Sequence, residues 1–335
     1  MIPTVSQAGD YSAQKTMVDG MEVIRLLDAA HRTEVSVAPG LGNNAYEMTV
    51  NGKQILWSPY RSLKELRDTP VMAGNPLLAP WANRIDGDEY WANGRKYFLN
   101  PDLRNFRYDP GHKPIHGLLV YAKEWKVKNL TADGDSASVT SRLEFWRYPD
   151  WMAQFPFAHN LEITYRLKNG GLEVETLIEN LSAEPMPLSL GYHTYYRIDD
   201  TPRDECRVHV PARHQVVVSE SLIPTGEMKP VTMSDPQSLR GFLLDDGFTG
   251  LIRDSAGRAE FWVQGKEQKI KVIFGAKYDV AIVFAPPGRD FICFEPMVGI
   301  TNVFNLSQAG IYKGLQSIAP GQSWTESFRI VPEGY

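Results

Sequence analysis

The stretch Gly171–Asn180, "GLEVETLIEN", decides the fold class of this chain. Apolar side chains stand at positions 172, 174 and 178, and glutamates stand between and after them at 173, 175 and 179. A period of two is typical of a β-strand that buries one face and leaves the other in water. One-sided burial of this kind is typical of antiparallel sheets.

The same alternation recurs along the chain, in segments such as "EVSVAP", "NLEITYRL", "SVTSRLEFW", "KIKVIFG" and "VAIVFAP". Helical periodicity is scarce: "SLKELR", with Ser62 and Glu65 at capping-box spacing, predicts one short helix, and a further turn or two is expected after Gly299. Alternating β and α units are absent, which excludes a Rossmann fold or a (β/α)8 barrel. We predict one all-β domain over residues 1–335, a large antiparallel β-sandwich with few short helices.

Composition and charge exclude several classes of protein. The 335 residues are 43% hydrophobic and 22% charged, with a net charge of −5, and no basic run suits a nucleic acid partner. The opening "MIPTVSQAGDYSAQ" lacks the pattern of a signal peptide, and no apolar run is long enough to span a membrane. Cys206 and Cys293 stand apart within apolar segments, as buried free thiols do. A cytoplasmic protein is expected.

Four stretches place polar residues where packing alone would not. In "NPLLAPWANRIDGDEY", Asn83 and Arg84 follow an apolar entry. Arg84 either covers a sheet edge, pairs with Asp86, or donates to the neutral oxygens of a ligand.

In "GHKPIHGLLVYAKEW", His112 and His116 are four residues apart, a spacing common in helical metal sites. Gly111, Pro114 and Gly117 forbid a helix there, which argues against a metal pair. His116 is then either a site histidine at the start of a strand or a hydrogen-bonded core residue.

In "MPLSLGYHTYYRI", strand alternation would put Gly191, His193, Tyr195 and Arg197 on one face. An imidazole and a phenol on one face make either a polar pocket or a hydrogen-bonded part of the core.

In "FICFEP", alternation places Phe291, Cys293 and Glu295 on one face of an apolar strand. A carboxylate there must meet an arginine, a histidine or a ligand, because an unpaired buried charge is costly. A buried ion pair with Arg84 is the structural alternative. Pro296 suggests that the strand ends at a sheet rim.

In order along the chain, six segments resemble the aldose 1-epimerases of the galactose mutarotase-like superfamily: "NPLLAPWANRI", "IHGLL" followed by a tryptophan, "YPDWMAQFPFAHNLEITYRL", "LGYHTYYRI", "LLDDGFTGL" and "FICFEPM". They span roughly residues 75 to 297, and the resemblance implies the same β-sandwich with an open cleft. By this resemblance Glu295 is the catalytic base and His193 the catalytic acid. Arg84 and His116, with Asn83 beside them, hold the sugar.

The resemblance also implies a substrate-binding aspartate three positions before a phenylalanine, which selects Asp245 before Phe248, with Asp246 as the competitor. Tyr121 stands where the family more often has a charged residue, so the preferred sugar stays open. Trp81 or Tyr195 could stack on the sugar ring.

The implied reaction interconverts the α and β anomers of a free hexose by ring opening and closing. It needs Glu295 ionised, and His193 either protonated or sharing a proton with a nearby acid such as Asp245. It needs neither a cofactor nor a metal. The expected partner is a small-molecule sugar, with no nucleic acid and no membrane, and the chain is expected to be a monomer or a homodimer.

Three alternatives stay open. A hexose-6-phosphate mutarotase would use the loop cations Arg104, Arg107 and Lys113 for the phosphate. A sugar-binding or sensing relative would keep the cleft without turnover. A metal-dependent β enzyme would instead bring together the histidines at positions 112, 116 and 193.

Overall fold

The computed structural model describes residues 5–335, which form three large antiparallel sheets and three two-stranded ones. The six-stranded sheet runs in the order β1 (Val5–Ala8), β2 (Tyr11–Val18), β3 (Met21–Asp28), β4 (Thr33–Ala38), β5 (Asn44–Val50), β6 (Lys53–Gln54). The nine-stranded sheet runs in the order β12 (Lys126–Ala132), β13 (Ala137–Glu144), β14 (His159–Lys168), β15 (Gly171–Asn180), β29 (Ser323–Glu333), β25 (Lys269–Phe274), β24 (Ala259–Gln264), β19 (Arg207–His209), β22 (Gln237–Ser238).

The eight-stranded sheet carries most of the residues singled out above. Its order is β21 (Pro224–Pro230), β20 (Ala212–Val218), β23 (Leu244–Leu251), β26 (Val280–Ala285), β27 (Ile292–Met297), β17 (Gly191–Tyr192), β7 (Leu77–Leu78), and β18 (Tyr195–Tyr196) also pairs with β27. The small sheets pair β8 (Glu89–Ala92) with β9 (Arg95–Phe98), β10 (Arg107–Tyr108) with β11 (Pro114–Ile115), and β16 (Met186–Leu188) with β28 (Gln316–Ile318).

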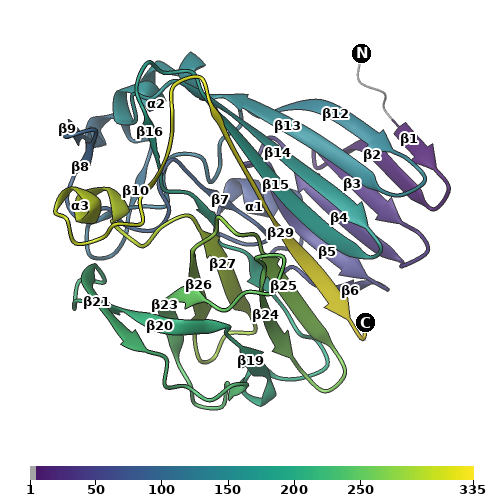
Figure 1. Cartoon of the computed structure of the whole chain (residues 1–335). Helices are drawn as coiled ribbons and strands as arrows, with labels where there is room; N and C mark the ends of the chain where they lie inside the picture. Colours follow the sequence, from purple (N-terminus) through teal and green to yellow (C-terminus); the bar gives the residue numbers. More distant parts are fainter. Residues whose placement is uncertain (1–4) are drawn as a thin grey trace.

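The nine-stranded sheet is the layer against which the other two large sheets pack (Figure 1). Strands β12, β13 and β14 contact β1, β2 and β3 of the six-stranded sheet. Farther along the same layer, the rings of Phe261 and Phe294 lie 5.8 Å apart, and those of Tyr192 and Phe328 lie 5.0 Å apart. The predicted antiparallel sandwich is therefore confirmed, with one of its two layers made of two sheets.

The stretch that decided the fold class is strand β15, and its burial alternates as predicted. Leu172, Val174 and Ile178 are buried, and the glutamates between them are partly exposed. β15 lies between β14 and β29, so its buried face contributes to the centre of the core. The predicted strand in "SVTSRLEFW" ends earlier than its pattern suggests, because Phe145–Arg147 form a 3-10 turn (η2).

Helices are few and short among the described residues. They are α1 (Leu63–Asp68), α2 (Pro149–Gln154) and α3 (Val303–Gln308), with two further 3-10 turns, η1 (Pro101–Leu103) and η3 (Arg203–Glu205). The helix predicted in "SLKELR" is α1, and the oxygen of Ser62 accepts a hydrogen bond from the amide of Glu65 at 3.2 Å. The turns expected after Gly299 are α3.

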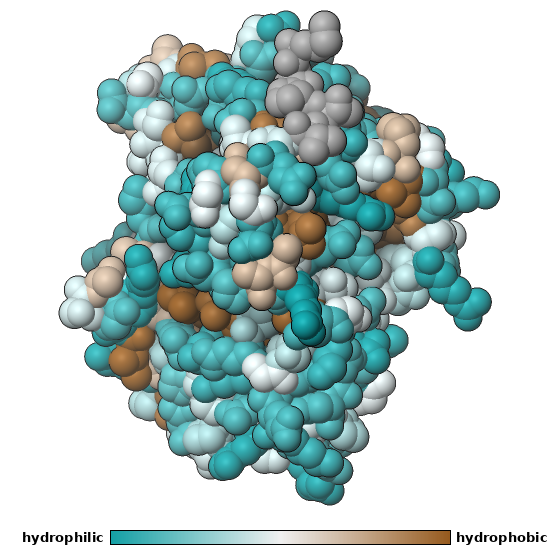
Figure 2. Space-filling view, turned by 90° about the vertical axis from the view of Figure 1, so that its right-hand side faces the viewer, coloured by the Kyte–Doolittle hydropathy of each residue, from teal (hydrophilic) through white to brown (hydrophobic). Residues whose placement is uncertain are grey.

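The two cysteines are free and buried, as predicted. Within residues 5–335, no helix has both the length and the apolar character that a membrane crossing requires. The face seen in Figure 2 is largely hydrophilic, with apolar side chains in small separate groups.

Candidate active site

Glu295 lies in the middle of the eight-stranded sheet, on β27. It shares a strand face with Cys293 and Phe291, as the alternation predicted. The register pairs Ile282 of β26 with Glu295 and Phe284 with Cys293, so these four side chains point to one side of the sheet. Only 1% of the surface of Glu295 is exposed. A buried carboxyl group on an otherwise apolar face is thus an observed feature of the fold.

The strand end predicted at Pro296 is wrong, because β27 continues to Met297. The neighbouring strand is interrupted instead: β18 pairs with Cys293 and β17 pairs with Met297. On the edge next to β17 and β18, residues 294–296 therefore have no ladder partner within residues 5–335, while β26 pairs with them on the other edge. A proline is tolerated at such a position.

His193 lies in that break. The predicted continuous strand from Gly191 to Arg197 is wrong, since β17 ends at Tyr192 and β18 begins at Tyr195. The amide of His193 donates to the carbonyl oxygen of Pro76 at 3.1 Å. Its ring stacks on that of Tyr195, with centroids 4.7 Å apart, so the predicted sharing of one face by these two side chains is kept.

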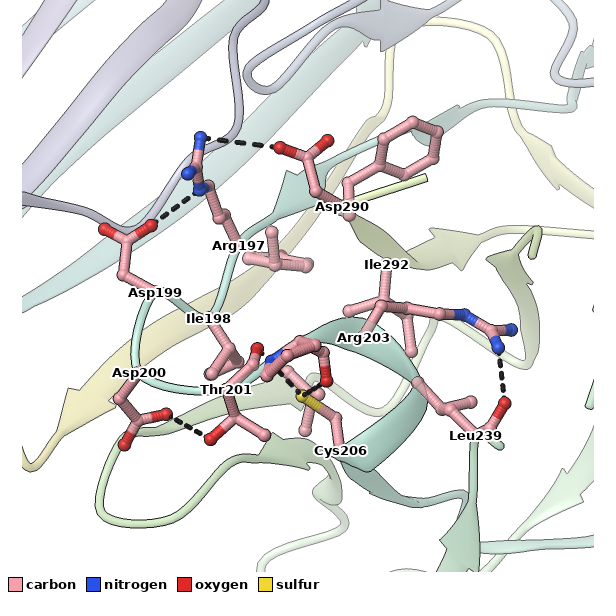
Figure 3. A pocket seen from close by; sticks show the side chains of 14 residues that line it. Arg197, Ile198, Asp199, Asp200, Thr201, Arg203, Cys206, Leu239, Asp290 and Ile292 are labelled. Carbon is pink, nitrogen blue, oxygen red and sulfur yellow. Dashed lines mark hydrogen bonds and ion pairs between the residues drawn. The ribbon is translucent and has the colours of Figure 1, made fainter. Parts of the chain in front are cut away.

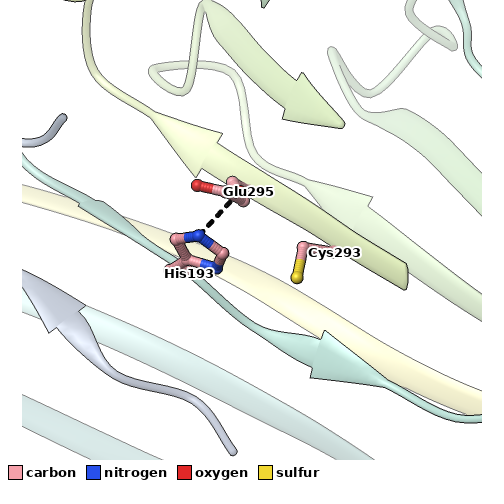
Figure 4. Close-up of side chains that lie close together, drawn as sticks. All are labelled: His193, Cys293 and Glu295. Atoms are coloured by element: carbon pink, nitrogen blue, oxygen red, sulfur yellow. Dashed lines mark ion pairs between the residues drawn. The ribbon is translucent and has the colours of Figure 1, made fainter. Parts of the chain in front are cut away.

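The imidazole of His193 and the carboxyl group of Glu295 face each other (Figure 4), with Nε2 and Oε1 3.3 Å apart. The remaining polar atoms of the pair, His193 Nδ1 and Glu295 Oε2, are buried and have no hydrogen-bond partner among residues 5–335. An unpaired buried polar atom costs free energy, so both atoms are suited to bind the polar groups of a ligand.

Burial governs the protonation of this pair. It raises the pKa of Glu295 well above its ordinary value; the charge of Asp245 raises it further, and Arg84 lowers it. Burial also lowers the pKa of His193 to about 3, and the charge of Arg107 acts in the same direction. Both shifts favour the carboxyl group over the imidazole as the holder of a proton shared by the pair. Both directions run against the expectation of an ionised Glu295 beside a protonated His193, which stays a prediction for the sugar-bound protein.

Arg84 is engaged elsewhere, which also removes the alternative of a buried Arg84–Glu295 ion pair. Its Nε donates to Asp109 Oδ2 at 2.6 Å, and its Nη1 donates to Asn83 Oδ1 at 3.0 Å. The pair with Asp86 does not form, because Lys113 Nζ takes that carboxylate at 2.5 Å. Asn83 and Asp109 thus fix the guanidinium of Arg84 at the wall of a cavity of about 40 Å³.

This small cavity joins Arg84 to the sheet face of Glu295. Its lining includes Asn83, Arg84, Asp245 and Ile282, the last being the ladder neighbour of Glu295. The structure thereby brings the predicted residues of the first, third and fourth stretches to one side of one sheet.

Asp245 and Asp246 lie on opposite faces of β23. The register pairs Asp245 with Phe284 and Phe284 with Cys293, so Asp245 is on the face of Glu295. Asp246 pairs with Val283, on the other face, and its Oδ1 accepts from Gln215 Nε2 at 2.5 Å. Partial desolvation raises the pKa of Asp245, against the opposing charge of Arg84.

His116 follows β11 and has a left-handed backbone with φ of 65°. Its ring meets that of His193 edge to face, with centroids 5.6 Å apart, and its Nδ1 is buried without a hydrogen-bond partner in the described part of the chain. Burial lowers the pKa of His116 well below its ordinary value, so the ring is neutral. The candidate trio of metal-binding histidines does not assemble, since His112 stacks on Tyr108 at 4.0 Å.

One group of three possible metal ligands does occur within residues 5–335: His193, Cys293 and Glu295, whose ligand atoms lie within 4.8 Å of one another. Burial raises the pKa of the Cys293 thiol well above its ordinary value, which keeps it protonated. A protonated thiol is a poor metal ligand.

The two candidate stacking residues differ. Trp81 is 1% exposed and packs edge to face on Phe106, so it has no face for a sugar. Tyr195 has its ring between His193 and Trp57, whose centroid lies 5.6 Å away. The expectation of Trp81 as a stacking surface is therefore wrong.

A larger cavity, of about 300 Å³, lies where β18 ends and β27 begins (Figure 3). Its charged residues satisfy one another: Arg197 pairs with Asp199 at 2.6 Å and with Asp290 at 3.5 Å. Asp200 accepts from Thr201 and from the backbone amides of residues 267 and 268. These contacts indicate a structural role for the groups that line it.

The sequence analysis did not single out Asp109. It considered Arg107 only as one of three loop cations that could bind a phosphate. Asp109 lies 25 positions after the arginine it holds, within a loop of no regular pattern. Arg107 reaches the neighbourhood of both site histidines, since its charge lowers the pKa of His116 and of His193. The pairing of β10 with β11 brings Arg107 close to His116, and no local sequence pattern predicts that pairing.

The chain is similar to several known proteins. The family model described as aldose 1-epimerase matches residues 26–331. The uncharacterized protein YihR of Escherichia coli is 29% identical over 196 residues, which cover 58% of this chain and 56% of YihR. YphB of the same organism, also uncharacterized, is 23% identical over 265 residues, covering 76% of this chain and 81% of YphB.

Among solved structures, a galactose mutarotase-like protein from Clostridium acetobutylicum superposes with a TM-score of 0.86 at 22% identity, covering 97% of this chain and 99% of its own. The galactose 1-epimerase of Lactobacillus acidophilus gives a TM-score of 0.71 at 15% identity, covering 96% of this chain and 97% of its own. At these identities the structural likeness shows the fold.

Proposed function

The chain belongs to the aldose 1-epimerase family, and on this premise we propose that it interconverts the α and β anomers of a hexose, with Glu295 as the base and His193 as the acid. The observation that carries this proposal is the buried contact of 3.3 Å between His193 Nε2 and Glu295 Oε1. Groups this close can act on the two oxygens bonded to one anomeric carbon, the C1 hydroxyl and the ring oxygen.

The single proton held by the pair makes the reaction possible. Its transfer from Glu295 to His193 Nε2 creates a carboxylate and an imidazolium, and a sugar hydroxyl that donates to the carboxylate favours that transfer. The carboxylate then takes the C1 hydroxyl proton while the imidazolium gives its proton to the ring oxygen, and the C1–ring oxygen bond breaks. Rotation about C1–C2 and the reverse proton transfers close the ring as the other anomer. Only protons move, and the pair is restored.

The remaining residues of the site suit the recognition of hydroxyl groups. Arg84 offers guanidinium donors fixed by Asn83 and Asp109. His116 has an unpartnered ring nitrogen, and Asp245 offers a carboxylate on the same face as Glu295. We propose Arg84, Asn83, His116 and Asp245 as the sugar-binding residues.

Anomer exchange in a panel of hexoses tests the proposal. The purified protein is added to equilibrated glucose, galactose and related sugars, and the exchange rate between the two anomeric proton signals is measured by NMR. Catalysed exchange of at least one sugar is expected. Saturable sugar binding by calorimetry with no accelerated exchange would instead identify a binding protein without turnover.

We predict an activity that stays level from pH 7 to about pH 5. An ordinary histidine gains its proton near pH 6.5, but burial lowers the pKa of His193 to about 3. Burial raises the pKa of Glu295 well above its ordinary value, so activity should fall only as the pH rises through that raised value and the pair loses its proton. Exchange rates across this range, with fluorescence as the control for folding, check the prediction. A decline centred near pH 6.5 would contradict it.

The two aspartates of β23 give a matched comparison. Asp245→Asn is expected to lower kcat/KM by about 10- to 100-fold, because it removes a charged acceptor for a sugar hydroxyl. Asp246→Asn, on the opposite face, should stay within about 3-fold of wild type, since it keeps an acceptor for Gln215. Anomer exchange rates over a range of sugar concentrations measure both. The reverse order of effects would assign the sugar contact to Asp246.

A further inference from the structure

A third cavity, beside the segment that follows His116, has a cationic lining. Its volume is about 400 Å³, and it adjoins Gly117, the residue after His116. Its wall includes Arg104, Arg107 and Lys123, with Glu124 as the acidic residue among the lining. The cavity therefore carries an excess of positive charge in a protein whose net charge is −5.

These three cations have no ion-pair partner within residues 5–335. The neighbouring loop cations Arg84 and Lys113 are each paired, with Asp109 and Asp86. Lys113, one of the residues considered for a phosphate, is thus already engaged. The three cations that line the cavity are therefore the ones whose charges are left without an ion pair in the described part of the chain.

Arg107 is held in place by contacts that leave its charge free. Its guanidinium carbon lies 5.3 Å from the ring centroid of Tyr121, and its Nη2 lies 3.7 Å from Met72 Sδ. Stacking on a tyrosine orients a guanidinium without neutralising it. Tyr121 stands where the resemblance to aldose 1-epimerases led us to expect a charged residue. Its hydroxyl is buried and has no hydrogen-bond partner among the described residues.

Arg107 and Arg84 lie next to different members of the acid–base pair. Arg107 contacts Met72, which packs against the cluster that contains Tyr195, and Tyr195 stacks on His193. Arg84 lines the small cavity together with Ile282, the ladder neighbour of Glu295. The charge of each arginine acts on the pKa of the same member of the pair. The register of β10 and β11 pairs Arg107 with Ile115, directly before His116. Arg107 is therefore the cation on the side of the proposed acid.

The bonding of a pyranose determines which part of the sugar lies next to His193 and Arg107. The acid gives its proton to the ring oxygen, which is bonded to C5, and C6 is the substituent of C5. A group on C6 is thus the part of a hexose that extends beyond the ring oxygen. We propose that the cavity binds an anionic group at C6 of the substrate and that Arg107 recognises it. The inference rests on the proposed function, because it uses the placement of C1 and the ring oxygen at Glu295 and His193.

NMR anomer exchange with charged and neutral hexoses tests this. Glucose 6-phosphate and glucuronate are the charged probes, and glucose and galactose are the neutral ones. We expect the wild type to favour at least one charged probe over the neutral sugars by about 10-fold or more in kcat/KM, since a charge-assisted contact strengthens binding by about that factor. The phosphate and carboxylate probes distinguish a tetrahedral from a planar anion. The preference should shrink in high salt because Arg107 is exposed.

Three variants locate the effect. Arg107→Gln should lower kcat/KM for the charged probe about 10- to 100-fold more than for glucose, and Arg107→Lys should restore part of the difference. Arg32→Gln is the control, since Arg32 lies in the β3–β4 turn, donates to Asn51 and has no ion-pair partner within residues 5–335.

Equal or better turnover of neutral sugars by the wild type, or equal losses for both kinds of sugar in Arg107→Gln, would overturn the inference and leave the proposed function standing. Absence of catalysed exchange for every sugar would overturn the proposed function, and the inference with it.

Discussion

Glu295→Gln is expected to lower kcat for anomer interconversion by about 10²- to 10⁴-fold, the usual contribution of a positioned acid or base. Glutamine has the size of the protonated carboxyl group but cannot take the C1 hydroxyl proton. The exchange of anomeric proton signals at saturating sugar measures the loss. Glu175→Gln, on the solvent side of β15, is the matched control and should stay within about 3-fold of wild type.

The same substitution separates catalysis from stability. Burial raises the pKa of Glu295 in the folded state, so its contribution to stability is complete below the ordinary pKa near 4.5 and is lost as pH rises through the folded-state value. Glutamine has no proton to lose. Glu295→Gln should therefore gain stability relative to wild type as pH increases from about 5 to 8, as measured by urea unfolding. Near-normal activity in a folded Glu295→Gln variant would refute the assignment of Glu295 as the base.

The alternating strand pattern was enough to predict the fold class, because the burial of one strand face depends on local alternation of apolar and polar residues. "GLEVETLIEN" became β15, and the shared face of Cys293 and Glu295 followed from the same period of two. A local pattern is enough wherever one strand meets the core along its whole length.

Long-range pairing decided what the pattern did not predict. The break at His193 and the continuation of β27 through Pro296 depend on which strand lies beside which. Arg84 forms its ion pair with Asp109 and not with the nearby Asp86, because the carboxylate of Asp86 is already paired with Lys113. The same limit applies to protonation: the sequence places an acid and a base on one face, but only burial in the folded sheet sets which of them holds the proton.

Gly117→Ala is expected to lower the free energy of unfolding by about 3 kcal/mol or more, an effect outside the usual range for a surface glycine. Gly117 has φ of +68°, and a Cβ there would lie 2.1 Å from the carbonyl oxygen of Ala79. That oxygen already accepts hydrogen bonds from the amides of Leu118 and Leu119 at 2.7 and 3.1 Å. Moving it away from the new Cβ would break these hydrogen bonds. Urea unfolding followed by tryptophan fluorescence measures the change.

The effect should reach the site as well, because His116 and Gly117 are consecutive left-handed residues and any shift of this turn moves the His116 ring away from His193. Gly94→Ala is the matched control: Gly94 follows Asn93 in the same left-handed pair, with φ of 71° and 51°, but a Cβ there meets nothing within 4 Å. It should cost only the backbone strain of about 1 to 2 kcal/mol and leave anomer exchange unchanged. If both alanine variants lost the same stability, the approach of Gly117 to Ala79 would not be what holds His116 in place.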